Sequence, residues 1–81
     1  MTDTELMSRL LGLLKPFAPE VDFDDIDTSA NLQEEVEIDS FDFLNFLIAI
    51  DEDMGVMVPE SDYGQVMSLD DLMDYITARV V

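Results

Sequence analysis

Few side chains in this sequence are suited to covalent chemistry. It has no His and no Cys, and Lys15 is its only lysine. The sequence therefore lacks the side chain that most often acts as a general base near neutral pH, and it offers no thiol nucleophile. Zinc ligation by thiolate or imidazole is excluded for the same reason. What remains is a set of hydroxyls and an unusually large number of carboxylates.

The carboxylates dominate the electrostatics of the chain. Twenty Asp and Glu residues stand against three Lys and Arg, which gives a net charge of −17 at pH 7. Eighteen of these acids lie between Lys15 and Arg79, a stretch that contains no basic residue. Nucleic acids and anionic membranes are bound through basic side chains. We therefore expect basic proteins as partners, no nucleic acid and no stable insertion into a membrane.

A calcium loop would be the most specific site that such acids form. An EF-hand loop needs Gly at its sixth position and Glu at its twelfth. A loop starting at Asp22 would place Asp27 and Gln33 there, and one starting at Asp51 would place Val56 at the sixth position. Neither fits, so no dedicated metal site is expected. A carboxylate enzyme is also disfavoured, because it needs a cleft that separates two pKa values and 81 residues leave little room for one. The chain is not expected to be an enzyme.

Helices must position whatever site the chain carries. The first helix is predicted to begin with the capping box Thr2-x-x-Glu5. It should end near Leu14 or Lys15, because Pro16 cannot continue a regular helix. A long acidic loop should follow, anchored to the core by its apolar side chains and containing one short helical turn. The loop spans Ala18 to Ile38, and these side chains are Val21, Phe23, Ile26, Leu32, Val36 and Ile38.

The second main helix is predicted to start at Asp39-Ser40. Asp39 can cap its first turn, and Gly55 is suited to end it in the left-handed conformation. One face of this helix is apolar, and it carries Phe43, Phe46, Leu47, Ile50 and Met54.

The rest of the chain is predicted to form a short helical turn at Pro59–Tyr63 and a last helix opening at Ser68. The apolar residues of the last helix are Leu69, Leu72, Met73, Ile76 and Val80. The expectation is one all-α domain over residues 1–81. It should be a small four-helix bundle, with three main helices, one short third helix and a long loop between helices 1 and 2.

The segment Glu35-Val36-Glu37-Ile38-Asp39-Ser40-Phe41-Asp42-Phe43-Leu44 resembles the acyl carrier proteins and the wider phosphopantetheine-carrier family. The family signature is Asp-Ser-Leu at the start of the second helix, followed by an acid and aliphatic residues. Asp39-Ser40-Phe41-Asp42 matches it with one conservative change. The resemblance covers essentially all 81 residues, through the acidic end of the helix at Asp51-Glu52-Asp53, the segment Val58-Pro59-Glu60 and the ending Leu72-Met73-Asp74-Tyr75-Ile76.

The sequence departs from the family pattern at a few positions. Glu37 stands where the family often has Gly, and Phe41 replaces the usual Leu. Asn45 stands where carriers of fatty-acid synthesis usually have an acid, and Phe43 adds aromatic bulk. Gly64-Gln65 is expected to interrupt the third helix. These departures favour a specialised carrier, with the general fatty-acid role still open.

The resemblance implies that 4′-phosphopantetheine, transferred from coenzyme A by a phosphopantetheinyl transferase, is attached to Ser40 beside Asp39. The thiol of the group would hold an acyl group as a thioester. Enzymes of fatty acid, lipid or secondary-metabolite biosynthesis would load and use that group. The residues from Met1 to Glu5 lack the basic start of a secretory signal, and the longest apolar run, Phe46–Ile50, is too short to span a membrane. A cytoplasmic monomer is therefore expected.

Two further roles follow for the second helix. Phe41, Asn45, Ile48 and Glu52 fall on one line beside Ser40. The resemblance implies that they, with Asp42, dock onto basic patches of partner enzymes. The alternative is that Phe41 and Ile48 belong to the core. A set of apolar residues is expected to line a space that shelters the acyl chain, although ordinary core packing would need the same ones: Phe46, Leu47, Ile50, Val66, Leu72 and Ile76.

A second class of function stays open at this point. The chain would then be an acidic helical adaptor of carrier fold that binds basic partner proteins without a prosthetic group. The acyl group, the pathway and the loading enzymes are not determined by the sequence.

Overall fold

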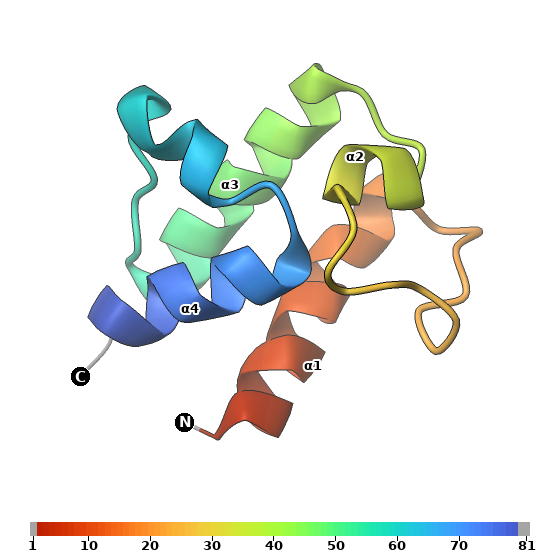
Figure 1. Ribbon diagram of the computed structural model, residues 1–81, viewed down its shortest axis with the longest axis horizontal. Helices are drawn as coiled ribbons and strands as arrows, with labels where there is room; N and C mark the ends of the chain where they lie inside the picture. The colour runs from red at the N-terminus through yellow and green to blue at the C-terminus, as the bar shows by residue number, and fades with distance from the viewer. Residues whose placement is uncertain (1, 80–81) are drawn as a thin grey trace.

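The computed structural model describes residues 2–79, and within them the chain is helical, with no β-strand (Figure 1). Its α-helices are α1 (Asp3–Leu14), α2 (Leu32–Glu35), α3 (Ser40–Met54) and α4 (Leu69–Arg79), and its 3₁₀ helices are η1 (Lys15–Phe17) and η2 (Glu60–Gln65). The all-α prediction is confirmed, with η2 as the short third helix. Val80, which was predicted for the last helix, lies outside the described residues.

Both ends of α1 follow the sequence prediction. The Oγ1 atom of Thr2 accepts a hydrogen bond from the Glu5 amide at 3.1 Å, so Thr2 caps the start of the helix as predicted. The α-helix ends at Leu14, and Pro16 lies within η1. The chain therefore changes to a tighter helix where proline removes an amide donor.

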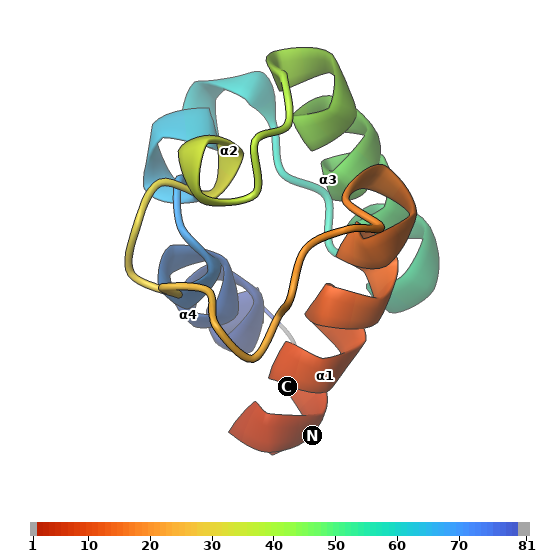
Figure 2. The same cartoon turned by 90° about the vertical axis from the view of Figure 1, so that its right-hand side faces the viewer.

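The helices pack around one hydrophobic cluster. Helix α1 contacts both α3 and α4, and η2 rests on α4. Figure 2 shows α1 beside α3, with α4 across the molecule from α3. The largest fully buried side chains come from every α-helix and from the segment after η2, and they are Phe46, Leu10, Leu14, Leu32, Ile50, Leu69, Leu72, Ile76 and Val66. Their removal from water is the main force that holds these short helices together.

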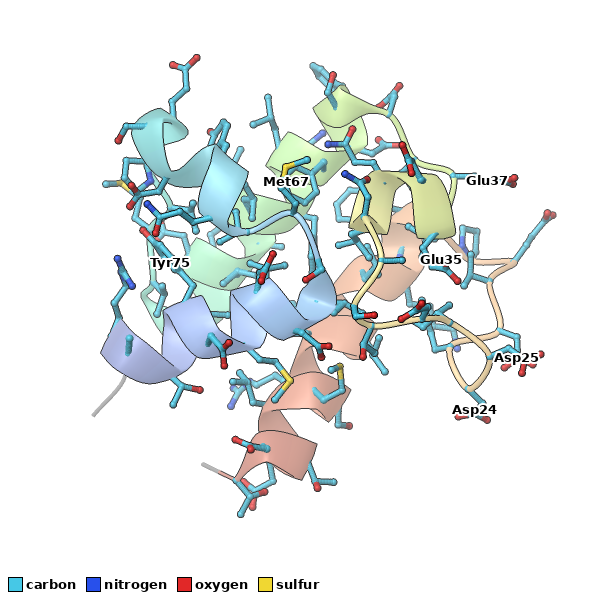
Figure 3. All side chains as sticks on the ribbon, viewed as in Figure 1. Asp24, Asp25, Glu35, Glu37, Met67 and Tyr75 are labelled. Atoms are coloured by element: carbon cyan, nitrogen blue, oxygen red, sulfur yellow. The ribbon has the colours of Figure 1, made fainter. Side chains whose placement is uncertain are left out.

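The long acidic loop is anchored as predicted. Its first apolar side chains, Val21, Phe23 and Ile26, are half-buried against the core, and the later ones, Leu32, Val36 and Ile38, are buried. Two backbone hydrogen bonds tie the loop to the start of α4: Leu32 N–H to Met67 O at 2.8 Å and Asp70 N–H to Thr28 O at 3.0 Å. The acids Asp24 and Asp25 lie at the outer bend of the loop (Figure 3).

The third-helix region differs from the prediction. Pro59 caps η2 rather than occupying its first position, and Gly64 and Gln65 belong to η2 rather than interrupting it. A 3₁₀ helix accommodates them, because its i→i+3 hydrogen bonds need only short runs of residues. Helix α4 then begins as predicted, with the Ser68 hydroxyl accepting a hydrogen bond from the Asp71 amide at 3.0 Å.

Candidate functional site

The start of α3 is defined by its capping residue, Asp39. Its backbone is extended (φ −83°, ψ 176°), and its Oδ1 atom accepts a hydrogen bond from the Asp42 amide at 2.8 Å. The Asp39 carbonyl accepts the first helical hydrogen bond, from Phe43 at 3.1 Å. Ser40 is therefore the first residue of a 15-residue helix, and it is exposed. In Figure 1 this end of α3 lies far from both chain termini.

The turn before Asp39 contains Glu37, at the position where the carrier family often has glycine. Glu37 has φ +55°, in the left-handed region that glycine adopts most readily. It ends α2 in the manner of a Schellman cap, because the Ile38 amide donates back to the Gln33 carbonyl at 3.1 Å. The Glu37 side chain points outward (Figure 3). The backbone shape that favours glycine is thus present here with a glutamate in place, at a conformational cost.

The start of α3 both attracts and repels a phosphate group on Ser40. The amides at the start of an α-helix and the positive end of its dipole attract negative charge. The carboxylates of Asp39, which caps the helix, and Asp42, half-buried in the first turn, repel it. The exposed hydroxyl at the helix start leaves room for a phosphodiester on Ser40 Oγ.

The line of residues predicted for docking lies mostly in solvent. Phe41 is 71% exposed and Ile48 is 54% exposed. The alternative in which these two residues belong to the core is therefore wrong. Glu52 is exposed, whereas Asn45 and Asp42 are half-buried at the side of the helix.

Sequence reasoning missed two members of this surface. Leu44 is 37% exposed and Met57 is 66% exposed. Leu44 lies three residues after Phe41 and four before Ile48, so helical spacing alone would have found it. Met57 follows the end of α3, and only the fold brings it to Ile48. We call Phe41, Leu44, Ile48 and Met57 the apolar stripe.

A groove of about 180 Å³ runs beside the apolar stripe, between α3 and η2. Leu44, Ile48 and Met57 belong to both features, and Asp51 lies at its edge. The remaining lining residues are Leu47, Val58 and Tyr63.

The residues predicted to line an acyl-chain space are all in the core. Phe46, Leu47, Ile50, Val66, Leu72 and Ile76 are each at most 4% exposed. Only Leu47 among them also lines the groove. The structure brings the six together, packed against one another as part of the hydrophobic cluster.

The described residues form neither a cluster of metal ligands nor a membrane span. In the part of the chain from residue 2 to residue 79, no three His, Cys, Asp or Glu side chains gather closely enough to hold a metal ion. None of the helices described there has the length and apolar character to cross a membrane.

Comparison with known proteins finds relatives of low identity. No family model matches the chain. Curated relatives include mitochondrial acyl carrier protein 2 of Arabidopsis thaliana, 28% identical over 94% of this chain, and the acyl carrier protein of Lactobacillus acidophilus, 24% identical over 98% of it. The mitochondrial acyl carrier protein of Neurospora crassa is 28% identical over 93% of this chain. The chain spans 60% and 56% of the lengths of the plant and fungal relatives, and 98% of the bacterial one.

These relatives are named as carriers, which agrees with the prediction of a carrier rather than an enzyme. The helical architecture agrees with that of the small carrier bundle. Together these observations show that the chain is similar to the acyl carrier proteins, at low identity and over nearly its full length.

Proposed function

We propose that the chain carries acyl groups as thioesters on 4′-phosphopantetheine attached to Ser40 Oγ. The observation that carries the proposal is the place of Ser40: an exposed hydroxyl on the first residue of α3, directly after the capping Asp39. The homology to acyl carrier proteins supports the same assignment. The prosthetic group supplies the thiol that the chain itself lacks.

The role of the protein at this site is to present the group. Ser40 supplies the attachment oxygen, and Asp39 holds the first turn of α3 in place through its hydrogen bond to the Asp42 amide. The free amides at the start of the helix stabilise the negative charge of the phosphodiester.

We further propose that α3 recognises the partner enzymes. These are a phosphopantetheinyl transferase and the enzymes that load and use the acyl group. Phe41 and Ile48 offer apolar anchors, and Leu44 and Met57 extend the same surface. Asp42, Asn45 and Glu52 flank it, and acids on this helix would steer basic patches of the partner into contact.

The cargo itself is proposed to be sheltered by the core. The groove beside Leu47 offers a way in from the surface. A long acyl chain would require the six core residues, which now pack in contact, to move apart. Short or polar cargo would instead stay near the surface.

The wider setting completes the proposal. We propose that residues 1–81 act as one monomeric carrier domain in fatty acid, lipid or secondary-metabolite biosynthesis. The cytoplasmic location stays a prediction, and two relatives named as mitochondrial make that compartment the alternative.

Intact-mass measurement tests the proposal. The wild-type chain is incubated with coenzyme A and a broad-specificity phosphopantetheinyl transferase. We expect the mass of one phosphopantetheine group to be gained by the wild type and not by Ser40→Ala. No gain on the wild type would contradict the proposal and favour the alternative, an acidic adaptor that has no prosthetic group. An equal gain on the variant would also contradict it, because the group would then be attached to another residue.

A further inference from the structure

Helix η2 forms one wall of the groove but is weakly held. Its residue Tyr63 lines the groove opposite Ile48 and Leu47 of α3. None of the six residues of η2 is buried, and its N-cap residue, Pro59, makes no side-chain hydrogen bond. A short 3₁₀ helix with these properties depends on contacts from outside itself.

Tyr63 packs against the hydrophobic cluster, and the polar contacts between η2 and α4 are made by Asp62. The Tyr75 hydroxyl of α4 donates a hydrogen bond to Asp62 Oδ2 at 2.6 Å. The Arg79 Nη2 atom lies 3.9 Å from the same oxygen. Figure 3 shows Tyr75 on α4, below η2. Asp62 also accepts a hydrogen bond from Gln65 within η2, at 3.3 Å.

Arg79 holds this arrangement together from the end of α4. Its guanidinium carbon lies 3.4 Å from the centroid of the Tyr75 ring, a cation–π contact. Its Nη1 atom donates to the Tyr75 carbonyl at 3.1 Å, which satisfies an acceptor in the last turn of α4. Tyr75 is 6% exposed, so its hydroxyl needs a partner where it lies.

The arginines of the chain lie at contacts between elements. The chain has only three basic residues, and its two arginines each join two separate elements. Arg9 of α1 pairs with Asp53 of α3 at 2.6 Å, and Arg79 of α4 pairs with Asp62 of η2. The remaining acids mostly repel one another. These two ion pairs are therefore the places where charge attraction holds two elements together.

We propose that Asp62, Tyr75 and Arg79 form a clasp that holds η2 against α4 and thereby sets the width of the groove between η2 and α3. Release of the clasp lets η2 move away, which widens the groove beside the apolar stripe. The consequence for docking and cargo rests on the proposed function, whereas the clasp itself is a property of the chain without any attached group.

Hydrogen exchange on the unmodified chain tests the clasp. Asp62→Ala removes the acceptor, and Asp70→Ala is the matched control, because it removes an equal charge from an exposed position on α4. We expect the amides of residues 60–65 to exchange about tenfold faster in Asp62→Ala than in Asp70→Ala, since one charge-assisted hydrogen bond is lost. The amides of α1 are expected to be unchanged. Tyr75→Phe, which keeps the ring and removes the hydroxyl, should reproduce the effect of Asp62→Ala.

The groove is followed in the same samples by NMR of the methyl groups of Leu44, Ile48 and Met57. Their shifts should change in Asp62→Ala and stay constant in Asp70→Ala. Equal exchange rates in the two variants would overturn the clasp, and unchanged methyl shifts would overturn its control of the groove. Because no prosthetic group is present, either failure is distinct from a failure of Ser40 to be modified.

Discussion

The Oδ1 atom of Asp39 accepts a hydrogen bond from the amide of Asp42 at 2.8 Å. Ser40, the first residue of α3, lies within the turn that this bond closes. The bond fixes where α3 begins. It thereby fixes the direction in which the Ser40 hydroxyl leaves the helix. Asp39 therefore has a structural role, capping α3, that is distinct from the effect of its negative charge.

Replacement of Asp39 distinguishes these two roles. Asp39→Ala removes the cap and should lower the free energy of unfolding by about 1 kcal/mol. Asp39→Asn keeps an oxygen acceptor without the charge and should stay close to the wild type. Urea denaturation of the three proteins measures the difference. Equal stability of all three would show that the cap does not hold the start of α3.

Replacement of Glu37 by glycine should stabilise the fold. At a φ of +55°, a residue with a side chain destabilises the folded state by about 1–2 kcal/mol. Glycine avoids this cost, but it also gives the unfolded chain more freedom, which offsets part of the gain. Glu37→Gly is therefore expected to raise the free energy of unfolding by about 0.5–1 kcal/mol. Glu37→Ala serves as the control, because it removes the charge and keeps the Cβ atom. If the two variants were equally stable, charge rather than backbone conformation would explain any gain.

The sequence was sufficient to predict most of the helix ends. Thr2, Asp39, Gly55 and Ser68 were each identified as helix-terminal residues from local signals, and each one acts as such a residue. Those signals depend on residues a few positions apart, which a sequence shows directly.

Features that depend on tertiary packing were not predictable in the same way. The exposure of Met57 beside Ile48 arises from the path of the chain after α3. The clasp joins Asp62 to Tyr75, thirteen residues apart and on different elements. The error at Gly64 has a related cause, because helix-breaking residues argue against an α-helix but not against a short 3₁₀ helix.

The apolar stripe should control the rate of modification of the chain. Phe41→Ala and Ile48→Ala remove side chains that are 71% and 54% exposed, so stability should change little. Each is expected to lower kcat/KM of a broad-specificity phosphopantetheinyl transferase about tenfold, as loss of a central apolar anchor does in other interfaces. Met67→Ala is the control, because Met67 is 40% exposed and lies between η2 and α4, outside the stripe. A loss of rate as large in Met67→Ala would refute a specific role for the stripe.

Asp27 should stabilise the fold near neutral pH and lose this effect in acid. The hydroxyl and the amide of Ser29 donate to its Oδ1 atom at 2.6 Å and 2.9 Å, and these hydrogen bonds lower the pKa of the carboxyl below its ordinary value. A lowered pKa means that Asp27 stabilises the fold above the ordinary pKa of an aspartate. This contribution is lost as the pH falls through the lowered value.

The measurement is the free energy of unfolding of the wild type and of Asp27→Ala at about pH 7 and at about pH 3. The wild type should be the more stable protein at the higher pH, and the difference should shrink at the lower one. Asp25→Ala is the control, since it removes a charge at the outer bend of the same loop and should relieve repulsion. A difference between wild type and Asp27→Ala that grows on acidification would contradict the assigned role.

The central claim is that Ser40, and no other serine, carries the prosthetic group. Ser61 is the matched comparison, because it is also exposed, precedes an acid and lies near the start of a helix, η2. Peptide mapping by mass spectrometry after incubation with coenzyme A and the transferase locates the modification. We expect one phosphopantetheine group per chain, on the peptide that contains Ser40, in both the wild type and Ser61→Ala. A modification on any other residue, or none on Ser40 in a folded chain, would contradict this claim.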